Sequence, residues 1–273
     1  MKNFVAEAFE QKQTSIWSSW QFVQSDFAEE FAFLRQNSPL VRNGKHQLIW
    51  RTKQKFVLKI TTASGKTFAY KAYDKLKKKY KFFFRLSPCG AEAVNYQLIK
   101  SINIPVPQIW AAGDVRRKGV LETAFIATEF AEGYLDGREF LADGKYHDRL
   151  DLQEEFIVRH LQLLARLHDH NILHRGFTPM NLLFRISDKV NSADCALDIM
   201  WIDVASCRKM PRFMLKKRMI VDFEQFFRFF EFSTEELRKY LNVYLAAAEK
   251  PLAASADEIL PKLEKALQKR RKR

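Results

Sequence analysis

This chain of 273 residues is poor in the residues that build loop-rich and disulfide-stapled proteins. It contains only 9 glycines, 8 prolines and 3 cysteines, and it shows no internal repeat. The cysteines, at Cys89, Cys195 and Cys207, form no CxxC pair. This excludes a zinc ribbon and indicates reduced thiols in the cytosol rather than a disulfide framework. No apolar run approaches the ~18 residues of a membrane-spanning helix, and the acidic residues in MKNFVAEAFEQKQ predict no secretion signal.

Hydrophobic residues and positive charge are abundant instead. A hydrophobic content of 47% with 29% charged residues is typical of a globular protein. Many of the 24 phenylalanines lie close together, and those of FEQFFRFFEF recur at helical spacing, which predicts core packing rather than a membrane face. The net charge of +14 favours an anionic partner, either nucleic acid, anionic lipid or a phosphorylated substrate. The alternative is a solvated basic face without a partner.

The residue pattern changes twice along the chain. Residues 1–45 mix aromatic and polar residues at spacings that predict a helical N-terminal extension. Residues 46–130 carry HQLIWR, KFVLKITT and KTFAYKAY, which predict an antiparallel meander, followed by a helix at CGAEAVNYQLIKSI and a strand at AFIATEF. Residues 131–273 are mainly helical, except for a hairpin predicted from NLLFRI and ALDIMWIDV, and STEE is a capping box. The order predicts an α+β fold of two lobes with a cleft between them.

Three histidines lie close together at His168, His170 and His174. Two histidines four residues apart would share one face of a continuous helix, as a zinc site requires. However, the helix is expected to end near Asn171, and no third ligand is evident. Structural histidines are therefore favoured over a metal site.

Four other residues follow one another in an order that suits phosphoryl transfer. Lys71 lies in FAYKAY on the third predicted strand, and Glu92 on the next helix is placed to pair with it. Asn181 and Asp203 lie at the ends of the two later strands, where an amide oxygen and a carboxylate are hard ligands for Mg²⁺. Such a transfer needs a cation for the nucleotide phosphates and oxygen ligands for the metal. Each residue alone is a weak signal, but the ordered set predicts a kinase-like fold.

The stretch LLARLHDHNILHRGFTPMNLLF, followed by WIDVASCRKM, resembles the lipopolysaccharide kinase family. The segments KAYDKLKKKYKFFF and GAEAVNYQLIKSINIPVPQIWAAGD, and RMIVDFEQFF further along, are also similar to that family. The similarity runs from roughly Ile49 to Phe230. It implies a protein-kinase-like fold with an N-terminal antiparallel β lobe and a C-terminal mainly helical lobe. It also implies transfer from ATP, with Mg²⁺, to Kdo or heptose in the lipopolysaccharide core.

The resemblance assigns nucleotide contacts to the first lobe. Lys71 would contact the nucleotide phosphates, and Glu92 would anchor that lysine. Glu129 and Phe130 would form the hinge, whose backbone binds adenine. The turn TTASGKTF has one glycine and lacks a GxGxxG pattern, so the covering of the phosphates departs from that of typical kinases.

In the second lobe the resemblance implies that Asn181 and Asp203 hold Mg²⁺ and that Asp222 braces the catalytic loop. Within that loop, after His174, the family's catalytic aspartate is replaced by Gly176. Glycine supplies neither a general base nor an anionic acceptor for a hydrogen bond, and a general base contributes about 10²–10⁴-fold to a rate. Asp169 is one conceivable substitute base.

Two hypotheses therefore follow from the loop. The first is an active sugar kinase. The second is a catalytically impaired pseudokinase that binds nucleotide or an anionic glycolipid as a scaffold or regulator. A nucleic-acid-binding module ranks third.

The chain has two lysine-rich segments, KLKKKYKFFFR and KALQKRRKR. They would suit contact with the anionic membrane surface in which a glycolipid acceptor resides. Lysines near an anionic membrane contribute about 1 kcal/mol each. The interleaved aromatics would also suit RNA, and a solvated basic helix is the plain alternative. The favoured interpretation is a cytoplasmic protein, peripheral on the inner membrane, whose partner is an anionic glycolipid or sugar acceptor.

Overall fold

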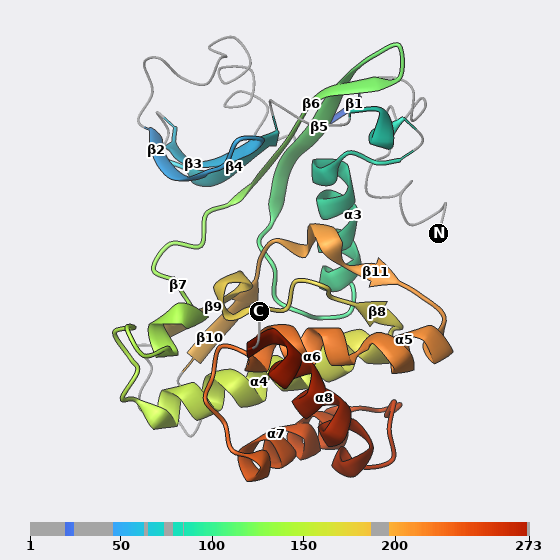
Figure 1. The fold of residues 1–273 in the computed structure, drawn as a ribbon. Coiled ribbons are helices and arrows are strands. Elements are labelled where there is room, and N and C mark those ends of the chain that lie inside the picture. The colour runs from blue at the N-terminus through green and yellow to red at the C-terminus, as the bar shows by residue number, and fades with distance from the viewer. Residues whose placement is uncertain are drawn as a thin grey trace. The chain divides into compact units, whose positions relative to one another are not determined.

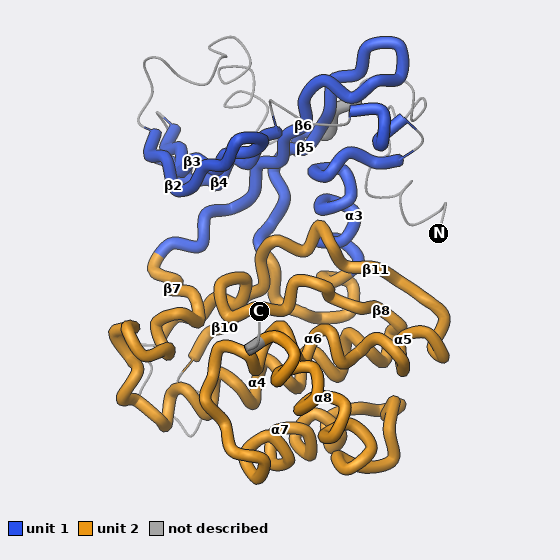
Figure 2. Tube along the Cα trace, viewed as in Figure 1, with its two compact units in different colours: residues 1–98, 107–132 blue, residues 99–106, 133–273 orange. Residues whose placement is uncertain are grey.

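The described chain forms two compact units. Unit 1 comprises residues 1–98 and 107–132, and unit 2 comprises residues 99–106 and 133–273 (Figure 2). The computed structural model describes residues 20–24, 46–62, 65–73, 79–83, 85–186 and 197–271. Cys195, part of the first basic segment and the last two residues of the chain lie outside these ranges.

Unit 1 is built on one antiparallel sheet with the strand order β1-β5-β6-β4-β3-β2 (Figure 1). The predicted meander is present as β2, β3 and β4, and the predicted helix is α3. The elements of this unit are β1 (Trp20–Val23), β2 (His46–Arg51), β3 (Lys55–Thr61), β4 (Thr67–Tyr73), the short helix η2 (Lys79–Phe82), α3 (Pro88–Lys100), β5 (Ile109–Arg117) and β6 (Val120–Glu129). The predicted antiparallel β lobe is therefore confirmed.

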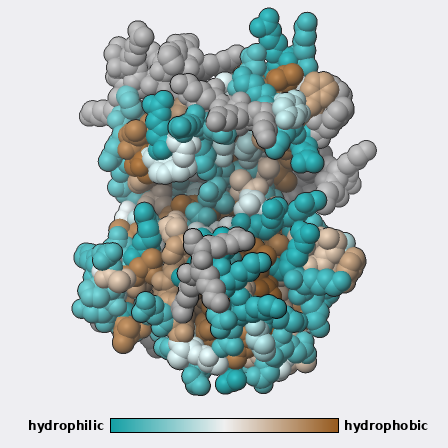
Figure 3. Space-filling model, viewed as in Figure 1, coloured by the Kyte–Doolittle hydropathy of each residue, from teal (hydrophilic) through white to brown (hydrophobic). Residues whose placement is uncertain are grey.

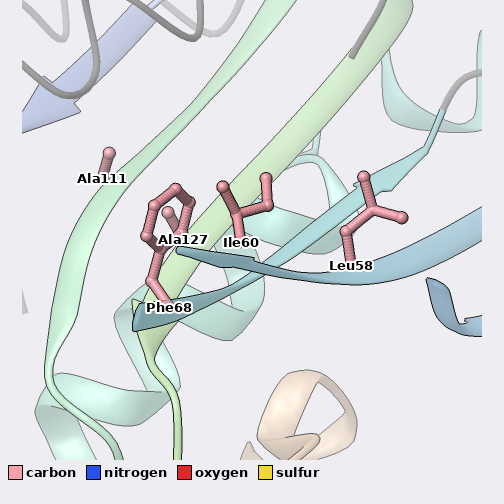
Figure 4. Packing of buried hydrophobic residues seen from close by; sticks show 5 residues of the cluster. All are labelled: Leu58, Ile60, Phe68, Ala111 and Ala127. Carbon is pink, nitrogen blue, oxygen red and sulfur yellow. The ribbon is translucent and has the colours of Figure 1, made fainter. Parts of the chain in front are cut away.

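A tight turn and a small apolar cluster fix the middle of this sheet. Gly65 lies in the turn between β3 and β4 with φ +85, a conformation that glycine adopts without the steric cost of a Cβ. Alternate residues of the neighbouring strands then bury their side chains together. The cluster consists of Leu58, Ile60, Phe68, Ala111 and Ala127 (Figure 4).

One short part of the predicted helical extension is a strand instead. Residues Trp20–Val23 pair antiparallel with β5, with Trp20 opposite Asp114 and Val23 opposite Ala111. The sequence WQFV is rich in strand-forming residues. Its partner, the edge of β5, lies far along the chain, so the spacing of residues within the N-terminal segment could not predict this pairing. The rest of the predicted extension lies outside the described residues.

Unit 2 is mainly helical, as predicted, and carries two small sheets. The predicted hairpin is formed by β9 and β10, in a sheet of order β10-β9-β7, while β11 pairs with β8. The elements are β7 (Leu135–Asp136), η3 (Gly137–Phe140), α4 (Leu150–Asp169), β8 (Ile172–Leu173), η4 (Pro179–Asn181), β9 (Leu182–Ile186), β10 (Leu197–Trp201), η5 (Val204–Ser206), β11 (Arg208–Lys209), α5 (Arg212–Arg218), α6 (Ile220–Phe227), α7 (Thr234–Ala247) and α8 (Ala256–Arg271).

Aromatic side chains fill the core of unit 2. The phenylalanines of α6 and of the turn after it are buried, as their helical spacing predicts: Phe223, Phe226, Phe227 and Phe230. Helix α7 begins with the predicted capping box, in which Ser233 and Glu236 each bind the other's backbone N–H. Outward-facing residues are mostly hydrophilic, with apolar ones interspersed (Figure 3). Within the described ranges, no helix combines the length and the apolar character that crossing a bilayer requires.

Candidate active site

Unit 1 contributes a buried ion pair between neighbouring elements. Lys71 projects from β4, and its Nζ lies 2.8 Å from Oε2 of Glu92 on α3. The two side chains are only 11% and 3% exposed, so their charges are largely removed from water. Burying an ion pair contributes little net stability, and a retained pair of this kind points to a role in binding. Burial, together with the Glu92 charge, raises the pKa of the nearby Cys89 thiol and keeps it protonated.

The end of β6 leads out of unit 1. The Glu129 N–H donates to the carbonyl of Gln108 at 2.8 Å, and the Phe130 N–H donates to the carbonyl of Thr67 at 3.4 Å. The ammonium group of Lys59 lies 4.4 Å from the centroid of the Phe130 ring. These contacts hold the predicted hinge residues against the sheet.

In unit 2 a buried carboxylate holds the loop that follows β8. Asp222, near the start of α6, accepts the backbone N–H of His174 at 2.8 Å and that of Arg175 at 2.7 Å. His168 Nε2 lies 3.2 Å from the same carboxylate, and its Nδ1 lies 2.8 Å from the Tyr244 hydroxyl. The carboxylate of Asp222 can only accept, so Nε2 of His168 is the donor in that contact. The Asp222 carboxylate thus holds the loop by binding the loop's backbone N–H groups.

The hairpin β9–β10 brings the two predicted metal ligands to one end. Leu182 at the start of β9 pairs with Trp201 at the end of β10. Asn181 immediately precedes the first of these, and Asp203 follows two residues after the second. The Ile202 N–H donates to the Asn181 carbonyl at 2.9 Å, which ties the two segments together.

The donor atoms at this end of the hairpin suit a hard cation. Asn181 Nδ2 donates to the Gly176 carbonyl at 2.8 Å, and because a carbonyl can only accept, this contact fixes the orientation of the amide and reserves Oδ1 as a ligand. Asp203 adopts a left-handed backbone with φ 52 and ψ 48, a conformation that is often found at functional sites. The described residues gather no group of three or more His, Cys, Asp or Glu for a metal. An ion at Asn181 and Asp203 would complete its shell with water and phosphate oxygens, as Mg²⁺ does.

The chain matches a family of known proteins over most of its length. The family model for the lipopolysaccharide kinase (Kdo/WaaP) family matches residues 32–244. The chain belongs to this family. A solved structure, "WaaP in complex with acyl carrier protein", is similar with a TM-score of 0.65 and 14% sequence identity, covering 92% of this chain and 98% of that chain. This likeness confirms the predicted kinase-like fold, with its antiparallel β lobe and its helical lobe. A search of curated proteins finds no match.

Gly176 occupies the position at which the resemblance described above implies a catalytic aspartate. Its carbonyl accepts the Thr178 N–H at 2.9 Å as well as the Asn181 amide. Its backbone lies outside the left-handed region, so other residues are conformationally allowed. A Cβ added at this position would lie 3.0 Å from Ser206 Oγ, which itself donates to the His174 carbonyl at 3.1 Å. A hydroxyl group therefore borders the place where the family's aspartate would begin.

The three neighbouring histidines that were considered as a zinc site lie in separate environments. His168 belongs to the brace around Asp222, and His170 Nδ1 lies 2.9 Å from the carbonyl of Arg166 on the surface. His174 is fully buried against the rings of Phe177 and Trp201. Burial lowers the pKa of His174 below its ordinary value and keeps the imidazole neutral, against the opposing effect of nearby carboxylates. These separate surroundings argue for structural roles.

Asp169, the predicted substitute base, is engaged elsewhere. Its carboxylate accepts the backbone N–H of Glu249 at 2.8 Å and that of Lys250 at 3.0 Å. These contacts hold the segment after α7, and they argue against a role in proton transfer.

Sequence reasoning missed two polar residues of the loop's surroundings, Ser206 and Tyr244. Tyr244 lies 76 positions from His168, so no local spacing could link it to the brace. Ser206 follows Asp203 by three residues, but its importance depends on the missing side chain at Gly176, which only the fold reveals.

Proposed function

We propose that this protein is an ATP- and Mg²⁺-dependent kinase that phosphorylates a sugar hydroxyl, of Kdo or heptose, in the lipopolysaccharide core. The observation that carries the proposal is the meeting of Asn181 and Asp203 at one end of the β9–β10 hairpin, with Asn181 Oδ1 reserved as a ligand. Membership of the lipopolysaccharide kinase family supports it.

Each retained residue has a role in this proposal. The Lys71 ammonium, held by Glu92, contacts the nucleotide phosphates, and the backbone around Glu129 and Phe130 binds adenine. Asn181 and Asp203 hold Mg²⁺, which neutralises the phosphate charge. Asp222 keeps the loop in place through the two backbone N–H groups that it binds.

Gly176 sets the expected rate of the reaction. In a loose, metaphosphate-like transition state, positioning and charge neutralisation carry much of the rate. The absence of a carboxylate at this position therefore slows transfer without abolishing it. The same residue favours a second candidate function, a pseudokinase that binds nucleotide or anionic glycolipid as a scaffold or regulator. The engagement of Asp169 by two backbone N–H groups also supports this alternative.

The proposed setting is the cytoplasmic face of the inner membrane, with an anionic glycolipid as acceptor. The net charge of +14 supports it, because a positive surface is attracted to anionic lipid.

The test joins a transfer assay to a binding assay. Labelled ATP, Mg²⁺ and deacylated lipopolysaccharide core are incubated with the protein, and label is expected on the sugar. Mg-ATP is expected to raise the melting temperature of the wild-type protein, and Lys71→Ala is expected to lose that shift. Lys53→Ala, which removes an exposed lysine of the same unit, is the matched control and should keep it.

The outcomes separate the candidate functions. A thermal shift without transfer would favour the pseudokinase. Absence of both the shift and the transfer would overturn both proposals.

A further inference from the structure

Unit 2 contains a third basic segment. Between Arg208 and Val221 the chain contains six cationic residues and no Asp or Glu. The cationic residues are Arg208, Lys209, Arg212, Lys216, Lys217 and Arg218. The segment begins with β11 and continues through α5 into α6, and neither of the lysine-rich segments noticed in the sequence includes it.

This segment lies beside the loop that holds Gly176. Strand β11 pairs with β8, with Arg208 opposite Leu173, the residue just before His174. The Met210 N–H then donates to the Asn171 carbonyl at 2.9 Å. A ligand of the basic segment would therefore be held next to the proposed catalytic loop.

The helices α5 and α6 have an inner and an outer face. Helical hydrogen bonding continues through Met219 between them, whose N–H donates to the Leu215 carbonyl at 2.8 Å. Residues four apart lie on one side of such a helix. Leu215, Met219 and Phe223 form the inner face and are buried.

The outer face repeats the same spacing with an unusual composition. Phe213, Lys217 and Val221 follow one another at four-residue intervals, and Phe213 is 66% and Val221 40% exposed. A single exposed apolar residue is ordinary on a protein surface. Here two such residues flank a lysine on one stripe, which is the pattern of a helix that contacts a membrane interface.

Most of the cations of this basic segment have no acidic partner among the described residues. Lys216 lies 3.6 Å from Glu258 in an exposed pair, and Arg212 donates to the Lys250 and Pro251 carbonyls. The remaining four are exposed, and none of them forms an ion pair within the part of the chain that the structure describes. They are Arg208, Lys209, Lys217 and Arg218.

We propose that this surface, here called the α5 face, binds the anionic surface of a lipid bilayer. The α5 face consists of Phe213, Lys216, Lys217, Arg218 and Val221. Its cations meet lipid phosphates while Phe213 and Val221 enter the region below the headgroups. A nucleic acid fits less well, because the face has one aromatic ring where single strands stack several bases.

This proposal builds on the proposed function, because a glycolipid acceptor resides in a bilayer, but its test needs no nucleotide. Vesicles of phosphatidylcholine, with or without phosphatidylglycerol, are sedimented with the full-length protein. We expect binding only to the anionic vesicles, and weaker binding at higher salt. Failure of phosphotransfer would leave this result untouched, so the two proposals fail separately.

Variants locate the contact on the α5 face. Each cation removed should lower the partition coefficient about fivefold, so Lys217→Gln with Arg218→Gln should lower it about 25-fold. Phe213→Ser should lower it about tenfold by removing a buried ring. The control pair, Lys145→Gln with Lys262→Gln, removes the same charge from two exposed positions of the same unit that lie outside the basic segments.

The possible outcomes divide clearly. A large loss in the α5 pair and little loss in the control pair supports the proposal. Equal losses in the two pairs would mean that total charge alone attracts the protein, and the proposal would be overturned. Absence of binding to anionic vesicles would also overturn it, and binding of single-stranded RNA through Lys217 and Arg218 would then assign the face to nucleic acid.

Discussion

Two buried carboxylates near the proposed site, Glu92 in unit 1 and Asp222 in unit 2, are held in different ways. In unit 1 side chain meets side chain: Lys71 pairs with Glu92, and Arg116 pairs with Asp114. In unit 2 the central carboxylate, Asp222, binds main-chain N–H groups and one histidine. An ion pair between two side chains is lost when either residue is substituted. A hydrogen bond from a backbone N–H is kept when the side chain of that residue changes.

This difference explains how the loop of unit 2 keeps its path with a glycine at its centre. Residues 174–176 are held through their own backbone atoms: the Gly176 carbonyl accepts the Thr178 N–H and the Asn181 side-chain amide, and the N–H groups of His174 and Arg175 bind Asp222. The aspartate of the family can thus be lost while the frame persists. The fold of the loop and its chemistry are separable, and mutations can test each in turn.

The largest expected effect comes from restoring the carboxylate with Gly176→Asp. If the frame is intact and only the base is missing, turnover should rise about 10²–10⁴-fold. The backbone allows the change, and Ser206 Oγ, 3.0 Å from the new Cβ, needs to move by only a few tenths of an ångström. The measurement is label transfer to deacylated lipopolysaccharide core under saturating ATP.

The control for this change is Gly176→Asn, which has the shape of aspartate without its charge and should not gain activity. Adding Ser206→Ala to Gly176→Asp relieves the crowding and should preserve or increase the gain. An unchanged rate in both aspartate variants would mean that another group already serves the acceptor hydroxyl.

The next largest effect is expected on the stability of unit 1, when Arg116→Ala removes one partner of its buried ion pair with Asp114. The guanidinium contacts both carboxylate oxygens of Asp114 and donates to the carbonyls of Phe82 and Arg85. Its removal breaks a buried ion pair and these hydrogen bonds of the guanidinium, and the expected loss of stability is about 3–5 kcal/mol. Urea unfolding measures the loss, and hydrogen exchange should place it in unit 1.

Arg117→Ala is the matched control, because it removes an exposed arginine from the adjacent position of β5. It should change the free energy of unfolding by no more than about 0.5 kcal/mol. Similar losses in the two variants would contradict the role given to the buried pair.

The sequence predicted elements with strong local signals better than contacts made at a distance. The meander, α3, the β9–β10 hairpin and the capping box at Ser233 were all evident from residue spacing and turn chemistry. The strand at Trp20–Val23 was not, because its partner β5 is far along the chain. Ser206 and Tyr244 were missed for the same reason, since tertiary packing alone brings them to the loop.

Asp222→Ala breaks the backbone brace of unit 2. The change leaves the backbone N–H groups of His174 and Arg175, as well as His168 Nε2, without this acceptor, which should cost about 2–3 kcal/mol. Hydrogen exchange should increase at His174 and Arg175, while peptides of unit 1 stay protected. Asp198→Ala, which removes one partner of an exposed pair with Arg185, is the control and should cost about 0.5 kcal/mol or less. Unchanged exchange at the loop in Asp222→Ala would show that other contacts hold it.

The smallest effect is an acid sensitivity confined to unit 2. Burial lowers the pKa of His160 and of His174 below the ordinary value of 6.5. Between the folded and unfolded pKa values the unfolded chain binds more protons, so the free energy of unfolding decreases as the pH falls below about 6.5. Each histidine contributes at most about 1.4 kcal/mol per pH unit there. His160 Nδ1 accepts the Trp201 indole N–H at 2.8 Å, so His160→Gln can keep an acceptor while removing the titration.

Urea unfolding at several pH values between 5 and 7.5 checks this expectation. His160→Gln should flatten the decrease in stability below pH 6.5, and hydrogen exchange should locate the acid-induced opening in unit 2, where both histidines lie. Unit 1 has no buried histidine among its described residues, so its strands should keep their protection over the same range. Equal acid sensitivity in both units would mean that carboxylates common to both, rather than the buried imidazoles, control the loss. The contrast between unit 1, which has no buried histidine among its described residues, and unit 2 with its buried His160 and His174 would then have no effect on the pH dependence of stability.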